Sequence, residues 1–311
     1  MINAPRLGPD PQVPTKRLAE LCVDDFLYPA FACRIAPMVD WTLDELISVC
    51  IARQCRDGEM VVQGLATPLV AAGYLLAKCT NAPDLMFASA IGQGICRDWA
   101  PLGLARVEAL WLDKALQSVG FALVVSQLLP RLQPLEFFRP AQIDPYGNFN
   151  NIALGADYRH PRLRLPGSGG IPDVTTYEDR ICLYVPRRSR VTFVEKLDFV
   201  SGLGHSPART RGAGPCYLVT EFGQFDFAGA SGRMRLTSLH PGVTLERVRV
   251  KTGFSFEVVP DCGFTEPPSA EAVRLLREDI DPLGVRRLEL LGGAGRREAL
   301  RTILEKEEAF V

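Results

Sequence analysis

The first clear pattern of apolar and polar positions begins at Thr42. Leucine and isoleucine recur at helical spacing from Leu43 to Ile51, and Thr42 with Glu45 forms a capping box. Gly58 follows as a stop signal. The pattern predicts a helix that starts at residue 43 and ends before Gly58.

Strand and helix patterns then alternate. Residues 59–64 form an apolar run typical of a buried strand, 67–79 predict a helix with Pro68 at its first position, and 83–89 form the next strand-like run. A β–α–β alternation favours parallel strands covered by helices. We therefore expect an open, mostly parallel α/β sheet with helices on both faces.

The second half of the chain is rich in β-branched and aromatic residues, which favour strands. The run 134–150 predicts a strand that ends in a Pro-Tyr-Gly-Asn turn at 145–148, and further strands are expected at 180–186, 191–201, 216–228 and 232–242. Residues 120–132 fit either a strand or a helix. The charged segments 269–280 and 295–310 predict helices.

These patterns divide the chain into three parts. Residues 1–40 are rich in proline and lack periodicity, which indicates an N-terminal arm. Residues 41–262 carry the α/β pattern, and residues 263–311 form a charged, helical C-terminal extension.

Composition narrows the possible functions. Of 311 residues, 47% are apolar and 23% are charged, and 35 basic residues balance 36 acidic ones. This balance gives no field that attracts nucleic acid or an anionic membrane. The N-terminus has prolines and charges where a signal peptide needs an apolar segment. We expect a cytoplasmic protein with neither nucleic acid nor membrane as a partner.

Common site motifs are absent from the sequence. The nine cysteines include no C-x-x-C pair and the three histidines lie far apart, so no metal site is expected. The chain also lacks a phosphate-binding loop, a complete G-x-G-x-x-G, a G-x-S-x-G and an H-E-x-x-H.

Six longer motifs follow one another along the chain and carry more information than these short ones. The chain carries, in order, QGLATPLVAAGYLLAKCTNAPDL, AQIDPYGNFNN, RLPGSGG, VEKLDFVSGLGH, GPCYLVTEFGQFDF and LTSLHPGVTLERV. This series resembles the β subunit of family I CoA-transferases, especially glutaconate CoA-transferase. It is also similar to the β subunit of a hydrolase that opens a ring of steroid-derived CoA thioesters. The resemblance spans about residues 42–258.

The resemblance implies an open α/β fold, a homologous α subunit and an active site where the two subunits meet. Coenzyme A then enters as part of the acyl-CoA substrate, and no permanently bound cofactor is expected. In the transferases a β-subunit glutamate attacks the acyl-CoA and then carries CoA as a thioester. Such a carboxylate nucleophile divides one difficult exchange into easier steps.

The same resemblance assigns a role to the glycine-rich segment. It implies that Gly167, Ser168, Gly169 and Gly170 present backbone N–H groups to the thioester oxygen, as an oxyanion loop. The alternative is a flexible turn before the helix-like residues that follow.

Five further residues fall in the matching motifs as candidates for substrate binding: Gln63, Gly64, Asn148, Asn150 and Phe225. Asparagines in a turn are more often local caps, and an aromatic residue in an alternating strand is more often part of the core. His240, which precedes a proline, is expected to bond the backbone rather than act as a base.

The sequence departs from the family at the nucleophile. Alignment of the Asn-Ala-Pro turn puts Ala90 where the glutamate should be, and no Asp or Glu occurs between Asp84 and Asp98. Ser89 is a polar candidate beside it, although a small residue at a strand end also needs no function.

We therefore expect a β-like subunit of a heteromeric enzyme of this family that acts on an acyl-CoA. The missing glutamate favours a catabolic hydrolase or lyase whose acid–base group comes from the α subunit. One alternative is a true CoA-transferase with its nucleophile elsewhere, and another is a non-catalytic scaffold or ligand sensor.

Overall fold

The first two helices follow their predicted capping signals. The computed structural model describes residues 40–64, 67–89, 93–104, 113–206 and 209–308. Helices α1 (Leu43–Ala52) and α2 (Pro68–Cys79) begin at the predicted residues. The Thr42 amide donates to Glu45 Oε2 at 2.8 Å, which satisfies a backbone N–H at the start of α1. Apart from Asp40, the proline-rich arm lies outside the described residues.

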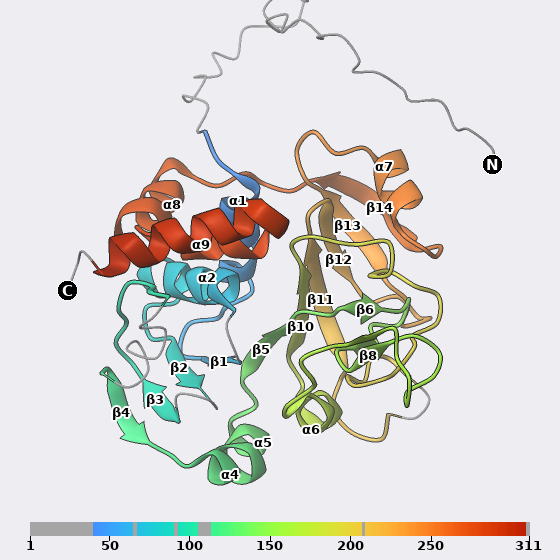
Figure 1. The fold of residues 1–311 in the computed structure, drawn as a ribbon, viewed down its shortest axis with the longest axis horizontal. Helices are drawn as coiled ribbons and strands as arrows, with labels where there is room; N and C mark the ends of the chain where they lie inside the picture. The colour runs from blue at the N-terminus through green and yellow to red at the C-terminus, as the bar shows by residue number, and fades with distance from the viewer. Residues whose placement is uncertain (1–39, 65–66, 90–92, 105–112, 207–208, 309–311) are drawn as a thin grey trace, which may run out of the picture. The chain divides into compact units, whose positions relative to one another are not determined.

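A ten-stranded sheet, in the order β14-β13-β12-β11-β10-β5-β1-β2-β3-β4, organises the fold (Figure 1). Its parallel centre consists of β11 (Pro215–Thr220), β10 (Ile181–Val185), β5 (Leu135–Phe138), β1 (Met60–Gln63) and β2 (Met86–Ser89). One side is extended by β12 (Gly223–Asp226), β13 (Arg235–Leu239) and β14 (Glu257–Phe264), and the other by β3 (Gly94–Cys96) and β4 (Ala115–Ser118). The sheet is mixed, with antiparallel pairs on both sides of the parallel centre, and the predicted mostly parallel sheet is confirmed.

The strand order reverses between β1 and β5. After β1 the chain crosses through α2 to β2 on one side, whereas after β5 it continues to β10 on the other. In open α/β sheets, ligands bind beyond the carboxyl ends of the strands at such a switch point. We therefore expect a site at the carboxyl ends of β1 and β5.

Helices cover both faces of the sheet, as predicted. Helices α1, α2 and α8 (Ala270–Arg274) contribute to one buried cluster, with Leu46, Leu75 and Phe87 among its members. Helices α5 (Leu129–Leu132) and α6 (Ile171–Tyr177) contribute to a second cluster on the opposite face. Figure 1 shows α1, α2 and α8 above β1 and β2, with α5 and α6 at the other end of the view.

The remaining elements are short or peripheral. They are α4 (Phe121–Leu123), a π-helix (Val124–Leu128), β6 (Gln142–Ile143) with β7 (Phe149–Asn150), β8 (Ala153–Leu154) with β9 (Leu163–Arg164), α7 (Leu245–Lys251), a second π-helix (Leu275–Ile280), a 3₁₀-helix (Val285–Glu289) and α9 (Gly293–Glu308). The ambiguous segment 120–132 is thus helical, and the charged C-terminal segments form the expected helices.

Three strand predictions need correction. The run 134–150 forms no single strand: β5 ends at Phe138, Pro140 has no amide with which to continue the ladder, and the chain goes on through the short β6 and β7. Residues 191–201 form a loop with one isolated bridge at Phe193, and the exposed Asp198 in this loop accepts hydrogen bonds from Gln142 and Gly155 instead of lying in a strand. Residues 216–228 form not one strand but the hairpin β11–β12. Thr220 Oγ1 closes its turn by accepting from the amides of Phe222 and Gly223.

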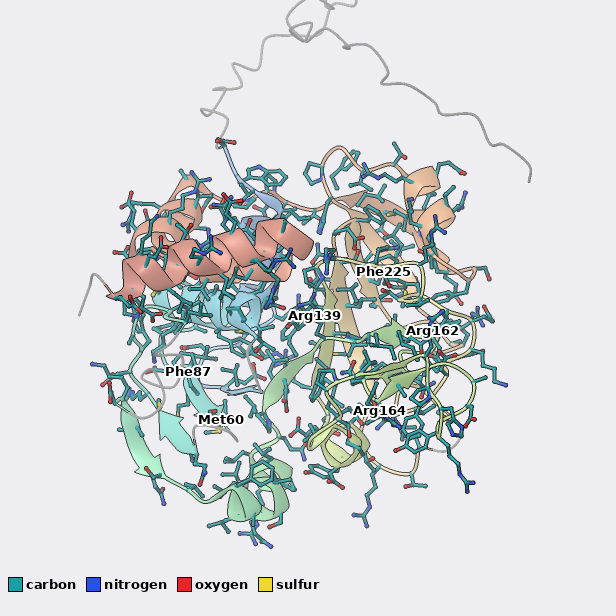
Figure 2. The ribbon with its side chains drawn as sticks, in the orientation of Figure 1. Met60, Phe87, Arg139, Arg162, Arg164 and Phe225 are labelled. Atoms are coloured by element: carbon teal, nitrogen blue, oxygen red, sulfur yellow. The ribbon has the colours of Figure 1, made fainter. Side chains whose placement is uncertain are left out.

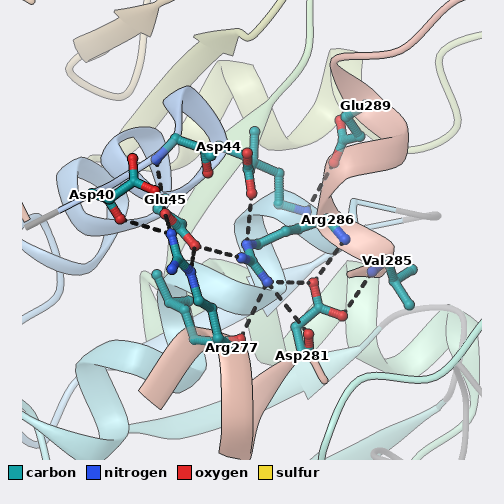
Figure 3. A network of polar contacts seen from close by, with 11 residues as sticks. Asp40, Asp44, Glu45, Arg277, Asp281, Val285, Arg286 and Glu289 are labelled. Atoms are coloured by element: carbon teal, nitrogen blue, oxygen red, sulfur yellow. Dashed lines mark hydrogen bonds and ion pairs between the residues drawn. The ribbon is translucent and has the colours of Figure 1, made fainter. Parts of the chain in front are cut away.

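A buried ionic network joins the C-terminal segment to α1 (Figure 3). Arg286 is 3% exposed and pairs with Asp44, Glu45 and Asp281 at 2.9–3.1 Å. Burial acts to raise the pKa of Glu45, but its hydrogen bonds with Arg277 and Thr42 hold that pKa below the usual value. Residues 39–311 accordingly form one compact unit.

Candidate functional site

Gly64 and Glu136 meet at the switch point of the sheet. Gly64 directly follows β1, and Glu136 lies opposite Val62 in the parallel register of β5 with β1. Glu136 Oε1 lies 3.8 Å from the point where a Cβ on Gly64 would stand. Because Gly64 has no side chain, no Cβ separates the Glu136 side chain from the backbone at the C-terminal end of β1.

Glu136 forms part of a buried carboxyl pair with Glu178, which follows α6. The two residues are 6% and 0% exposed. Burial raises the pKa of Glu136 to about 8. Burial and the neighbouring Glu136 charge raise the pKa of Glu178 to about 10. Both groups therefore favour the protonated form near neutral pH.

The sequence reasoning missed this pair. Glu136 stands within LEFF, where all four residues are buried, and Glu178 ends a short helix. A charged residue inside an apolar strand is a signal, because strands buried on both faces are normally apolar throughout. The position of Glu178 opposite it depends on tertiary packing that the sequence does not display.

Arg139 follows β5 on the other side of the switch point, near the middle of the molecule (Figure 2). Its guanidinium donates to Glu289 Oε2 at 2.9 Å. Glu289 also accepts from the Leu69 amide at the start of α2 and from the Tyr184 hydroxyl. The C-terminal segment therefore fixes the elements around the site.

The predicted oxyanion loop leads into α6, with Gly170 as the residue before the helix. Gly167 and Gly169 have φ values of +114° and +52°, which favour glycine. The Gly167 amide donates to the Asn151 carbonyl at 3.1 Å, so this N–H is occupied. Any oxyanion donors in this loop are then the amides of residues 168–170.

The structure describes some of the other predicted residues and not others. Ser89 ends β2 and is buried, and its backbone lies opposite Gln63 in the register of β1 and β2. The Gln63 side chain and Ala90 lie outside the described part of the chain. Ser89 is thus the one of these three residues whose side chain the structure describes.

Asn148 and Asn150 have structural partners. Asn148 Oδ1 accepts from the Gly204 amide, and its Nδ2 donates to Asp144. Asn150 Nδ2 donates to Gln142 and the Ala153 carbonyl, and its Oδ1 accepts from two amides. These contacts use the hydrogen-bonding capacity of the Asn150 amide, as the local-cap interpretation predicts.

Phe225 and His240 are packed inside the protein. Phe225 is 1% exposed and meets Phe256 edge-on, so the side chain proposed for substrate binding fills the core instead (Figure 2). His240 Nε2 lies 2.9 Å from the Thr220 carbonyl. Burial lowers the pKa of His240 to about 4, which agrees with a structural role.

An open pocket of about 850 Å³ lies beside the Asn148 turn. Arg209 lines it but donates to backbone carbonyls, including those of Thr175 and Gly204. Among the described residues, no group of three His, Cys, Asp or Glu side chains has the arrangement of a metal site. Within those same ranges, no helix is long and apolar enough to cross a bilayer.

Comparison with known proteins identifies the family. The coenzyme A transferase family profile matches residues 45–251. The chain belongs to this family. It is 32% identical over 264 residues to a subunit of glutaconate CoA-transferase from Acidaminococcus fermentans, and the match covers 80% of this chain and 96% of the relative.

Other members of the family carry out different reactions. The chain is 30% identical over 241 residues to the cholesterol ring-cleaving hydrolase IpdB subunit of Rhodococcus jostii, covering 75% of this chain and 89% of the relative. The crystal structure of the decarboxylase AibA/AibB matches with a TM-score of 0.71 and 28% identity, over 82% of this chain and all of that one. The chain is thus similar to subunits of a transferase and of a hydrolase, and to a decarboxylase.

Proposed function

We propose that this chain is the β-like subunit of a heteromeric enzyme that hydrolyses or cleaves a catabolic acyl-CoA without carrying CoA on its own glutamate. The observation that supports this proposal is the sequence around the end of β2. It has no Asp or Glu between Asp84 and Asp98, and Ala90 stands where the resemblance to the transferases puts their nucleophile. A glutamyl thioester requires a carboxylate at the thioester carbon.

A hydrolytic reaction fits the rest of the site. The amides at 168–170 are candidates to stabilise an oxyanion, and Gly64 lies at the switch point, where open α/β sheets bind their ligands. The matches to a ring-cleaving hydrolase subunit and to a decarboxylase support a reaction other than transfer.

A true CoA-transferase is the second candidate, because the chain is 32% identical to a glutaconate CoA-transferase subunit. This alternative requires a nucleophile other than residue 90. The two candidates differ in one observable: only a transferase places CoA covalently on this subunit.

The test is to purify the chain with its α-like partner and incubate the complex with glutaconyl-CoA and a panel of other acyl-CoA thioesters. We expect free CoA to accumulate without an acceptor acid. Treatment with borohydride or hydroxylamine, followed by mass measurement of each subunit, should show no CoA adduct on this chain. Glutaconate CoA-transferase treated in parallel is the positive control.

Either of two results would contradict the proposal. A CoA-sized mass gain or a reduced glutamate on this chain would establish the transferase. A complex that binds thioesters but releases no CoA from any of them would favour the scaffold or sensor alternative.

A further inference from the structure

Glu136 and Glu178 are two buried carboxyl groups without a compensating cation among the described residues. Three of their four carboxyl oxygens are buried and have no hydrogen-bond partner within those ranges. The cation nearest in sequence, Arg180, pairs with Glu59 and donates to the Gln54 carbonyl instead. Burial of unpaired acids costs stability, so a structural role gives no reason for their presence.

The pair faces the carboxyl ends of the parallel strands. Glu136 shares its row with Val62 and Ala88, and its Oε1 approaches the open position at Gly64. Among the described residues, Glu136 Oε1 is the one non-neighbouring atom within 4 Å of the point where a Cβ on Gly64 would stand. An acyl group bound at the switch point would therefore meet the Glu136 carboxyl.

One short element links the pair to the candidate oxyanion loop. Gly170 precedes α6, and Glu178 follows it. The end of α6 is held against α5, because the Asp179 amide donates to Gln133 Oε1 at 2.9 Å and Gln133 Nε2 donates to the Tyr177 carbonyl. This packing holds the end of α6, where the Glu178 carboxyl interacts electrostatically with that of Glu136.

We propose that Glu136 is the general base of the hydrolysis and that Glu178 is a positioning residue that keeps a proton beside it. This inference rests on the proposed function. Glu136 takes a proton from water as the water oxygen bonds to the thioester carbon. The C–S bond then breaks with its electron pair on the CoA sulfur, and Glu136 returns the proton to that sulfur. The products are a carboxylic acid and CoA.

The groups around Glu136 favour its role as the general base. The titratable groups that interact with the pair are Tyr177 on α6 and Tyr74 on α2, and neither is a cation. Burial raises the pKa of Glu136 to about 8, which makes its carboxylate a stronger base than an exposed one. Because Glu178 has the higher pKa, it keeps its proton while Glu136 loses one.

The experiment compares Glu136→Gln with wild type in the purified complex, using a thioester that the wild type hydrolyses. General acid–base catalysis contributes typically 10²–10⁴-fold, so we expect kcat to fall at least 10²-fold with KM nearly unchanged. Wild-type kcat/KM should rise with pH through the titration of the pair, and the variant should lose this rise. Glu178→Gln should move the pH profile while it retains more activity than Glu136→Gln.

Asp173→Asn is the matched control, because Asp173 is an exposed acid on the same helix. It should keep the wild-type rate and profile. An active wild type with an equally active Glu136→Gln variant, or an unchanged pH profile in that variant, would overturn the assignment of the base. A wild-type complex that hydrolyses no thioester would instead refute the proposed function, and the base with it.

Discussion

At the scale of single residues, the buried Glu136 and Glu178 lower the free energy of unfolding by an amount that depends on pH. A buried carboxylate is less stable than a buried carboxylic acid, so both pKa values are raised above 4.5, the ordinary value. Below that value both folded and unfolded chains are protonated, and the pair has no effect on the pH dependence of stability. As pH rises further, the unfolded chain releases protons that the folded chain holds, so the free energy of unfolding falls.

Replacing Glu136 with glutamine should therefore stabilise the protein in a pH-dependent way. We expect Glu136→Gln to match wild type near pH 4 and to exceed it at pH 7 by on the order of 3 kcal/mol. Denaturant unfolding across this pH range is the measurement. Asp173→Asn should show no such trend, and a stability difference that is constant with pH would show that Glu136 is not held protonated.

At the scale of elements, local signals predicted most of the fold. The capping signals at Thr42 and Pro68 placed α1 and α2, because both act within one turn of helix. The apolar runs placed the central parallel strands. The loop at 191–201 was mistaken for a strand because its apolar residues resemble one, while Asp198 bonds to segments distant in sequence.

The site was predictable only in part. Gly64 follows β1 and the glycine loop precedes α6, as expected of motifs that depend on local backbone geometry, and the roles of both in the site stay predictions. Phe225 and Asn150 lie in matching motifs for packing reasons. Glu136 was missed because its partner Glu178 is distant in sequence, and only the packing of α6 against the sheet brings the two carboxyl groups together.

The glycine loop gives the prediction at this scale. Gly169 has φ of +52°, so any side chain there adds backbone strain. Gly170 has φ of −82°, and an added Cβ would lie 3.9 Å from the nearest Val174 atom, so alanine fits. If these amides must approach an oxyanion, we expect Gly170→Ala to melt as wild type but lose activity by about 10²-fold.

Steady-state kinetics and thermal melting together test this expectation. Gly295→Ala is the control, because Gly295 lies in α9 with open space around an added Cβ. It should leave turnover unchanged. Equal turnover in both variants would reduce the glycine loop to a connecting turn.

At the scale of the whole molecule, the edge of the sheet at β4 is unusual for an isolated subunit. β4 is the last strand in the order, and its Leu116 is 64% exposed. Phe121 and Leu123 on the adjacent α4 are each about half exposed. Exposed apolar side chains beside an open strand edge promote association, and large patches of this kind mark interfaces.

We expect the α-like partner subunit to cover this β4–α4 edge, since the related decarboxylase is an assembly of AibA with AibB. Introducing a charge at a buried interface is costly, so Phe121→Glu should abolish co-purification of the partner and with it thioester hydrolysis. Val250→Glu is the matched control, because Val250 is 70% exposed on α7, away from this edge. Sedimentation of each variant with its partner distinguishes the outcomes. A heteromer that forms equally well with Phe121→Glu would place the interface elsewhere. A wild-type monomer that hydrolyses thioesters alone would show that no partner is needed.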